Sequence, residues 1–577
     1  MLPGIVGQVV AVNRLTGRWP FALRAGFCMA APVVAGWAAG DVAAGLTATI
    51  GGFTALYGSG RPYAYRALEL AVVAVSLAVA VTLGDWAAST DPWLGVAVTS
   101  AIAAVAVLVC NTLAVGPPGA YMFALACAAG VGISVEHESP WHLGVLVLCG
   151  GAFSWLVHMS GALVRYRGPE RAAVAAAERA VHRLAEDVGT AAENRSVDAA
   201  ARALHHSWVV LVTFQPIRPE RSAALQRLRA TNHRLHATFA GLVSGTTGPH
   251  SERGPRTDEI PLGRPGGVAL LRSALAGSHP LRVAVQVGVA AVVAGSLATA
   301  LGVDRGYWAI AAAVLVLHNG FDRRRTVVRG LQRLLGTLAG LGLAGGILGL
   351  HPHGPWLAAL LFVLQFSIEM LVVRNYALAT VVITPTALTI ASGGRPIGDL
   401  GELLLTRGVD TLIGCAVAFA VLLLGGHRYE ATRIRTALAD ALDALALLVP
   451  HLAAGEVTSA SARVARRDAQ TRAMALLVAY DAAVQSGSRA SRAAERLWPA
   501  VAACERLTYR TLAACWHVQH PGSRRPVDPA DGERLHADLA DLATAARTGA
   551  PPVADGAVPA FAADEIVEAR QVLSARA

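Results

Sequence analysis

Twelve apolar stretches alternate with short polar loops along the chain, and a polar insert divides them into two sets of six. Each stretch has about the length that a helix needs to cross a hydrocarbon core of roughly 30 Å. The first set is expected at residues 21–39, 43–59, 67–84, 93–112, 119–134 and 141–163. The second set is expected at residues 281–302, 306–319, 329–350, 355–373, 376–392 and 407–425. The pattern predicts an all-α membrane protein with two six-helix transmembrane bundles.

Charged residues concentrate in two polar regions, residues 165–280 and 427–577. Ala, Leu, Arg and Glu dominate there, and Leu438, Leu442 and Leu445 recur at helical spacing. Helices are expected at residues 168–188, 196–213, 219–243, 430–454, 459–486, 490–518 and 529–547. The predicted domains are a first transmembrane bundle (1–164), a helical domain (165–243), a Gly- and Pro-rich linker (244–280), a second transmembrane bundle (281–426) and a C-terminal helical domain (427–577).

Arginine is distributed unevenly between the loops on the two sides of these spans. If the N-terminus is cytoplasmic, Arg61, Arg66 and Arg323–Arg325 fall inside, and the turns with Asp85 and Asp91 fall outside. This asymmetry follows the positive-inside rule. We therefore expect a multi-pass protein of a bacterial plasma membrane with both termini and both polar regions in the cytoplasm. The start of the chain resembles a signal peptide, but a second span follows at once, which favours a first transmembrane helix.

The two apolar blocks resemble each other. Val33–Gly36 and Val292–Gly295 share the sequence Val-Val-Ala-Gly, and arginine-rich loops follow at nearly the same offset. Six spans in each block would give both copies the same orientation. An internal repeat with a pseudo-two-fold axis along the membrane normal is therefore expected.

Composition and motifs exclude several other classes of protein. The net charge is +10, but no basic run with interleaved aromatics occurs, so nucleic acid is not an expected partner. The chain has no P-loop, no Gly-x-Ser-x-Gly and no His-Glu-x-x-His, and its seven cysteines have no metal-ligand spacing. His351 and His353 are an isolated pair. We expect no enzyme activity, no cofactor and no metal; the expected partners are the bilayer and a small organic anion, and a homo-oligomer is left open.

Two acidic residues inside the second block are candidates for function, because ionisable side chains are costly in a membrane. Glu369 lies near the end of its span and could take up a proton or form a structural pair with Arg374. Asp410 follows Arg407 by almost one turn. It could belong to the proton or substrate path, or it could be a helix-start acid that the helix dipole favours.

Other residues of this block could contribute to an anion path. Arg329 and Arg333 belong to an arginine cluster that would attract organic anions, although topogenic charge explains much of it. Pro385, after Thr384, interrupts a span and could free backbone groups, or it could be an ordinary kink. Three aromatic residues could stack on a substrate or form an interfacial belt: Tyr307, Trp308 and Tyr376.

The order of short motifs in the second block resembles a known family. The motifs are Gly306-Tyr307-Trp308-Ala309, Arg329-x3-Arg333-x2-Gly336-Thr337-x2-Gly340, Glu369-x4-Arg374-Asn375-Tyr376, Thr384-Pro385 and Arg407-x2-Asp410-Thr411-x2-Gly414. Their order is similar to that of the fusaric acid resistance protein-like family, also described as aromatic acid exporters, which is distantly related to aluminium-activated malate transporters. The first block keeps Arg61 and Arg66 but lacks these motifs.

The resemblance implies a transporter that exports aromatic or other small carboxylic acids with the help of the proton gradient. It places Glu369, Asp410, Arg374, Asn375, Thr384 and Pro385 on a proton-coupling or substrate path. Two alternatives remain open from the sequence: a passive organic-anion channel, and a membrane-anchored scaffold or sensor that acts through its cytoplasmic helices.

Overall fold

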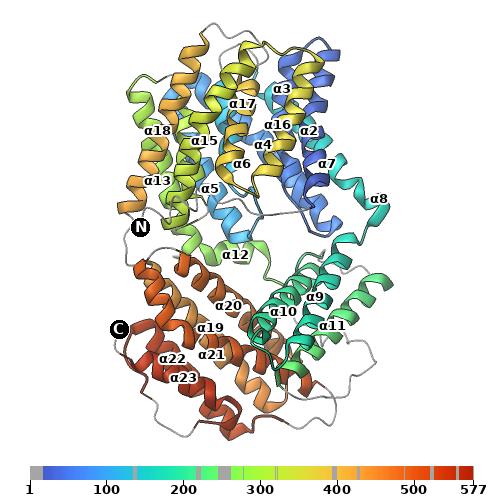
Figure 1. Ribbon diagram of the computed structural model, residues 1–577, viewed down its shortest axis with the longest axis vertical. Coiled ribbons are helices and arrows are strands. Elements are labelled where there is room, and N and C mark those ends of the chain that lie inside the picture. The colour runs from blue at the N-terminus through green and yellow to red at the C-terminus, as the bar shows by residue number, and fades with distance from the viewer. Residues whose placement is uncertain are drawn as a thin grey trace. The chain divides into compact units, whose positions relative to one another are not determined.

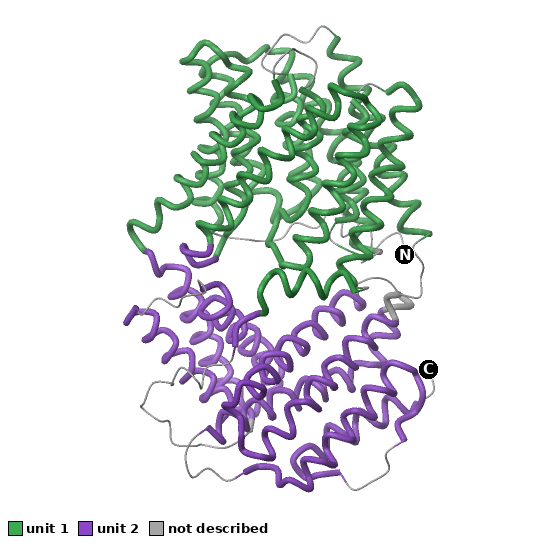
Figure 2. Tube along the Cα trace, turned by 180° about the vertical axis from the view of Figure 1, so that it is seen from behind, with its two compact units in different colours: residues 1–60, 66–165, 265–426 green, residues 61–65, 166–264, 427–577 purple. Residues whose placement is uncertain are grey.

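The computed structural model describes residues 17–133, 139–215, 222–244, 262–276, 278–303, 305–318, 320, 323–392, 399–424, 429–485, 488–519, 525–553 and 558–575. All regular secondary structure within these ranges is helical (Figure 1). The described chain folds into two compact units (Figure 2). Unit 1 contains residues 1–60, 66–165 and 265–426, which include both apolar blocks, and unit 2 contains residues 61–65, 166–264 and 427–577.

The first block of unit 1 consists of α2 (Trp19–Ala38), α3 (Val42–Gly52) with η1 (Phe53–Leu56), α4 (Tyr63–Thr90), α5 (Pro92–Leu113), α6 (Tyr121–Ile133), α7 (Pro140–Met159) and α8 (Gly161–Arg165). The second block consists of α13 (His279–Ala300), α14 (Tyr307–Leu317), α15 (Arg323–Gly349), α16 (Pro355–Leu371), α17 (Tyr376–Ala391) and α18 (Leu400–Leu424). The short α12 (Gly267–Ala274) lies in the segment that was expected to be a linker. Within that segment, residues 245–261 and residue 277 lie outside the described residues.

A helix occupies each of the twelve expected stretches, but not all are full spans. Eight described helices are long and apolar enough to cross a bilayer, and seven of them belong to unit 1. The other five helices in the expected stretches are shorter, at 10–17 residues. A helix of 11 residues rises only about 16 Å, about half the hydrocarbon thickness. The all-helical multi-pass prediction is confirmed, whereas an arrangement of twelve full-length spans is not.

The surface of unit 1 has the character of a lipid-facing surface. On α4, Leu68, Val72, Val75, Val79 and Leu83 are all exposed, and they follow one another at steps of three or four residues. Such a stripe of large aliphatic side chains needs an apolar environment. Helix α14 is the opposite case, because all eleven of its residues are buried. It is therefore enclosed by other helices of unit 1.

One expected outer turn is in fact helical. Asp85 lies within α4 and is 4% exposed, so the prediction that it sits in a solvent-exposed turn is wrong. The helix continues to Thr90 because Asp91 is the residue that caps the next helix, accepting hydrogen bonds from the backbone amides of Trp93 and Leu94. Glu136, Glu138, Arg14 and Arg395, which border other expected loops, lie outside the described residues.

The same pairs of helices pack together in both blocks. The first helix packs on the second (α2 on α3, α13 on α14), and the second packs on the sixth (α3 on α7, α14 on α18). Across the blocks, the first helix of each packs on the fourth of the other (α2 on α16, α13 on α5). The glycines of the two Val-Val-Ala-Gly sequences hold corresponding places, since Gly36 lies against Gly45 of α3 and Gly295 against Ile310 of α14.

Unit 2 contains the helices of the two polar regions. They are α9 (Gly168–Asp187), α10 (Glu193–Trp208) with the one-turn π-helix η2 (Val209–Thr213), α11 (Ala223–Ser244), α19 (Tyr429–Ala454), α20 (Ala460–Gln485), α21 (Ser488–Val518), α22 (Pro529–Thr548), η3 (Ala560–Ala562) and α23 (Ala563–Ser574). The expected helices of these regions are therefore present. The core of the C-terminal part is formed by aliphatic side chains of α19 to α23.

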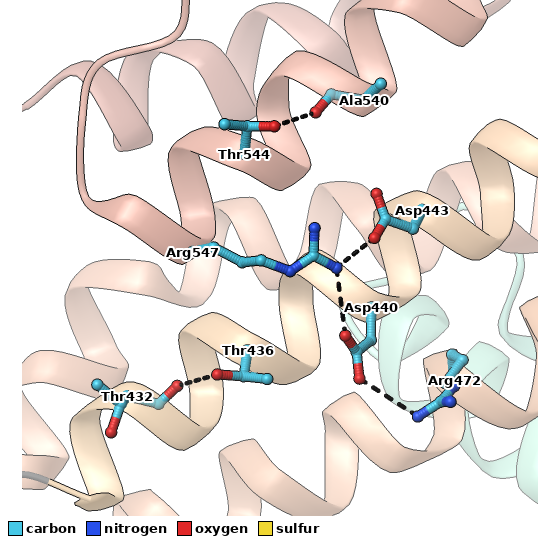
Figure 3. Close-up of polar contacts among 8 residues, drawn as sticks. All are labelled: Thr432, Thr436, Asp440, Asp443, Arg472, Ala540, Thr544 and Arg547. Carbon is cyan, nitrogen blue, oxygen red and sulfur yellow. Dashed lines mark hydrogen bonds and ion pairs between the residues drawn. The ribbon is translucent and has the colours of Figure 1, made fainter. Parts of the chain in front are cut away.

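The eighth apolar helix, α19, belongs to unit 2 and packs on α20, α21 and α22. Its outer face carries Asp440 and Asp443, which Figure 3 shows on either side of Arg547 from α22. Asp440 also accepts a hydrogen bond from Arg472 of α20 at 3.3 Å (Figure 3). A helix with two acidic residues paired to neighbouring helices is a domain-core helix rather than a lipid-facing span.

Candidate anion site

Three helices of unit 1 bring an arginine onto the face of a tryptophan. The guanidinium carbon of Arg407, on α18, lies 3.6 Å from the centroid of the Trp308 ring, on α14. Arg333, on α15, is close enough to Arg407 for the two positive charges to repel each other. The packing of α18 on both α14 and α15 creates this group. The sequence motifs predicted all three residues as site residues, and the structure brings them together.

The ionic groups of this cluster are buried, and most of their polar atoms lack hydrogen-bond partners in the described structure. Arg333 and Arg407 are each 1% exposed and Asp410 is fully buried. All three guanidinium nitrogens of Arg407, two nitrogens of Arg333 and both carboxylate oxygens of Asp410 have no hydrogen-bond partner in the described part of the protein. Buried charges without hydrogen bonds are strongly unfavourable. The arrangement therefore has unused capacity to bind a ligand, and its two cations outnumber its one acid.

The cluster lies deeper in its helices than the sequence suggested. Helix α18 begins at Leu400 rather than near Arg407, so Asp410 is its eleventh residue, and α15 begins at Arg323, ten residues before Arg333. The alternative in which Asp410 is a helix-start acid is wrong, because the N-terminal end of the dipole lies about 15 Å away at 1.5 Å per residue. In α15 and α18, polar residues at the start of the helix precede the apolar stretch, so the apolar stretch alone predicted a later start for both helices.

Tyrosine side chains surround the two arginines. Tyr307 is buried, its ring centroid lies 5.2 Å from that of Trp308, and it interacts electrostatically with Arg407. Tyr376, at the start of α17, lies under Arg329, whose guanidinium carbon is 5.7 Å from the ring centroid. Tyr121 of α6 interacts with both arginines, although it belongs to the first block. Sequence reasoning missed Tyr121, because the only signal was an aromatic residue that opens a short span.

Glu369 lies in a separate place and has a different partner from the one expected. Its carboxylate accepts a hydrogen bond from Arg18 Nη2 at 2.9 Å and one from Gln365 Nε2 at 3.1 Å. The pairing with Arg374 that the sequence suggested is wrong; residue 18, which directly precedes α2, takes that place because α2 packs on α16. Glu369 is 5% exposed as a side chain and Arg18 is 37% exposed, so the arginine is the more accessible partner of the pair.

Three further predicted site residues have local structural roles. Asn375 caps α17, accepting hydrogen bonds from the backbone amides of Ala377 and Leu378 at 2.8 and 3.2 Å. The Thr384 hydroxyl donates to the carbonyl of Thr380 at 3.0 Å. Pro385 cannot donate to the carbonyl of Val381 four residues earlier. That carbonyl instead lies against Gly340 of α15, where a Cβ atom would be 2.8 Å from its oxygen.

Comparison with known proteins identifies a family and several relatives that are similar to this chain. A family model described as "Fusaric acid resistance protein-like" matches residues 290–421. An uncharacterized membrane protein of Bacillus subtilis, YvaC, is 27% identical over 575 aligned residues, which cover 90% of this chain and 88% of the relative. The uncharacterized protein YhfK of Escherichia coli is 30% identical over a segment that covers 29% of this chain and 23% of the relative. The inner membrane protein YccS of Escherichia coli is 28% identical over a segment that covers 30% of this chain and 24% of the relative. No solved structure matches the chain.

Proposed function

From the premise that this chain is a membrane protein of the fusaric acid resistance protein-like family, we propose that it is a secondary exporter of small organic anions. The proposed substrates are aromatic or other small carboxylic acids, and the proposed driving force is the proton gradient. The proposed location is the bacterial plasma membrane, with both termini in the cytoplasm. The family match and the apolar helices support a membrane transporter; the substrate, the coupling and the orientation are part of the proposal.

One observation carries this proposal: Arg407 and Arg333 are buried side by side with five guanidinium nitrogens that lack hydrogen-bond partners in the described chain. A carboxylate is the natural complement, because a guanidinium can donate two parallel hydrogen bonds to its two oxygens. Trp308 and Tyr307 line the same place and would stack on the ring of an aromatic acid. The donor set therefore fits an aromatic carboxylate better than an uncharged solute.

Asp410 would make anion binding depend on protons. Its carboxylate is near Arg407 but does not pair with it in the described structure. An anion that enters beside an ionised Asp410 adds a second negative charge, whereas protonation of Asp410 removes that opposition. By linkage, the bound anion would also favour the proton on Asp410 by the same factor. A proton and an anion that cross together would not be driven outward by an inward proton gradient, so Asp410 is assigned a role in the affinity of the site and the exchange of protons for anions is assigned to Glu369.

Glu369 is the second proposed proton site. Protonation would weaken its ion pair with Arg18 and so loosen the contact between α2 and α16, which joins the two blocks. A membrane potential that is negative inside favours anion export by about 2.3 kcal/mol per charge for each 100 mV. This potential would add to the driving force of the proton gradient, and protonation of Glu369 would control access to the site.

The repeated helix pairings support the further proposal that the two blocks are structural repeats. The α2–α16 and α13–α5 contacts exchange under a two-fold operation that relates first helices to first and fourth to fourth. Arg333, Arg407 and Asp410 all belong to the second block. The path between two such repeats would then be asymmetric in charge, and its anion site would lie on one side of the pseudo-axis.

The test is efflux of a panel of labelled aromatic acids from cells that express the protein, with and without an uncoupler, for the wild type and for Arg407→Gln. Arg165→Gln is the matched control, because it removes the same charge from an exposed position at the end of α8 and is not a predicted site residue. We expect efflux above the empty-vector level that collapses with the uncoupler, that R407Q lowers at least tenfold and that R165Q leaves within twofold.

Other outcomes would select the alternatives. Flux that follows the membrane potential and ignores the uncoupler, yet still needs Arg407, would indicate an anion channel. Equal flux in R407Q and wild type would overturn the assignment of the site. No flux of any acid in a panel that spans aromatic and aliphatic carboxylates would contradict organic-acid export and favour the scaffold.

A further inference from the structure

Unit 2 contains a small, partly open cavity between four helices. Two of them, α10 and α11, belong to the first polar region, and the other two, α20 and α21, belong to the second. The cavity has a volume of about 40 Å³ and is lined mainly by aromatic and aliphatic side chains. The aromatic part of its wall is formed by Trp208, His236, Phe239, Tyr509 and Trp516. One cationic residue, Arg466 of α20, also lines it.

Arg466 is a buried cation without a carboxylate partner. It is 1% exposed, and the ion pairs of the described residues include none that involves it. Its guanidinium donates to the carbonyl of Val457 at 3.2 Å and to the amide oxygen of Gln519, which are both neutral acceptors. Its Nε atom has no acceptor in the described structure. Its guanidinium carbon lies 4.9 Å from the centroid of Trp516, so the charge sits at the aromatic wall.

The neighbouring groups do not neutralise this charge. His236 donates its Nδ1 proton to the carbonyl of Asn232 at 2.9 Å, and burial lowers the pKa of its ring to about 4, so it is neutral at pH 7. The Tyr509 hydroxyl donates a hydrogen bond to Glu505 at 2.6 Å, so the Glu505 carboxyl group already accepts a hydrogen bond. Arg463 also acts electrostatically on Arg466, and it is positive as well. A buried, uncompensated cation next to a cavity is a site for an anion.

We propose that this cavity binds a small monocarboxylate of the size of formate or acetate, with its carboxylate on Arg466 and its apolar end against Trp516. The size of the cavity sets this class. A single water needs roughly 10–15 Å³, and an engineered apolar cavity of about 150 Å³ holds benzene. A volume of about 40 Å³ therefore admits a few heavy atoms and excludes an aromatic acid.

A ligand in this cavity would connect the two polar regions of the chain. It would contact Trp208 and His236 from the helices that follow the first apolar block, and Arg466 and Trp516 from those that follow the second. The site is distinct from the proposed transport site because it uses none of the same residues. The occupancy of this cavity would thus follow the concentration of short-chain acids around unit 2, independently of the proposed transport site.

The test is equilibrium dialysis of the full-length protein in detergent with radiolabelled acetate, at constant ionic strength. Three variants accompany the wild type: Arg466→Gln at the cavity, Arg407→Gln at the membrane site, and Arg472→Gln as a surface control on α20, where the side chain is 55% exposed. We expect one saturable acetate site per chain that R466Q weakens at least tenfold and that R407Q and R472Q retain. Benzoate is expected to compete at least tenfold less well than formate.

The fold of each variant is checked by thermal unfolding, where R466Q should be as stable as the wild type because it removes an unpaired buried charge. Ala513→Met is a second variant, which fills the cavity from its wall and keeps the arginine; it should also abolish acetate binding. A site that R466Q and A513M retain, a site lost only in R407Q, equal competition by chloride, or no saturable acetate site would each overturn the proposal. Because R407Q tests the membrane site separately, failure of one assignment is distinguishable from failure of the other.

Discussion

The guanidinium group of Arg407 lies over the ring of Trp308, with 3.6 Å between the guanidinium carbon and the ring centroid. A planar guanidinium makes this contact and donates two parallel hydrogen bonds, whereas an ammonium cannot do both. We therefore predict that Arg407→Lys keeps the charge but loses at least tenfold in apparent substrate affinity, measured by efflux at varied internal acid concentration. Trp308→Phe keeps an aromatic face and should lose less than W308A. A Lys variant with wild-type affinity would contradict the bidentate role.

The Arg18–Glu369 pair predicts coupling between two residues that are 351 positions apart in the chain. Glu369→Gln and Arg18→Gln should each lower uncoupler-sensitive efflux, and the double variant should be no worse than the poorer single variant. Interaction energies for contacting pairs are typically about 0.5–3 kcal/mol. Arg374→Gln combined with E369Q is the control and should be additive. An additive R18Q–E369Q pair would show that the contact has no role in transport.

Close packing of α15 on α17 predicts a contrast between two glycines. A Cβ atom on Gly336 would lie 2.5 Å from the carbonyl oxygen of Ala377, whereas one on Gly342 would meet nothing within 4 Å. Gly336→Ala should therefore destabilise unit 1 by about 1–3 kcal/mol, the usual cost of overpacking. Gly342→Ala should be neutral or stabilising, because Ala has the higher helix propensity. Thermal unfolding in detergent measures both, and equal effects would argue against this helix contact.

Glu505 predicts a pH dependence of stability in unit 2. Burial raises its pKa from 4.5 to about 7, the nearby Asp198 carboxylate acts in the same direction, and the hydrogen bond from Tyr509 opposes both. The folded state therefore holds a proton that the unfolded state releases above pH 4.5. The stabilisation is present below that pH and is lost as the pH rises through 7.

The measurement is the midpoint of thermal unfolding between pH 4.5 and 8 for the wild type and for Glu505→Gln. His205 and His236 have pKa values lowered to about 4, so they favour the folded state as the pH rises through 6.5 and partly mask the effect. The difference between the two proteins isolates Glu505. We expect the wild type to lose a few degrees relative to E505Q between pH 5 and 7. Parallel profiles would rule out the raised pKa.

The helices and several residues of the candidate anion site could be predicted from the sequence for physical reasons. A helix that crosses a membrane is a long run of apolar residues, with few polar residues to break the run. Such runs can be recognised in the sequence directly, and all twelve expected stretches lie on helices. The motif residues Trp308, Arg333 and Arg407 each stand in an apolar run, where a cation or a polar ring is conspicuous. What joins them is the packing of α14, α15 and α18, which the sequence does not specify.

Two details were wrong where the answer depended on the fold. Arg374 is close to Glu369 in sequence, but Arg18 is the partner of Glu369 because α2 packs on α16. The sequence placed Asp410 near the start of its helix because the charged residues Glu402 and Arg407 precede it. Charged residues usually mark the end of a membrane span, but here they lie within α18.

The fully buried helix α14 is only 11 residues long. Its rise of about 16 Å leaves roughly half of a 30 Å hydrocarbon layer to be filled by other parts of the protein or by water at its two ends. The barrier to a charged solute grows with the length of path over which it must lose its hydration shell. A short buried helix shortens that path, so transport along the proposed route beside Trp308 should depend little on bilayer thickness, which the longer outer helices match instead.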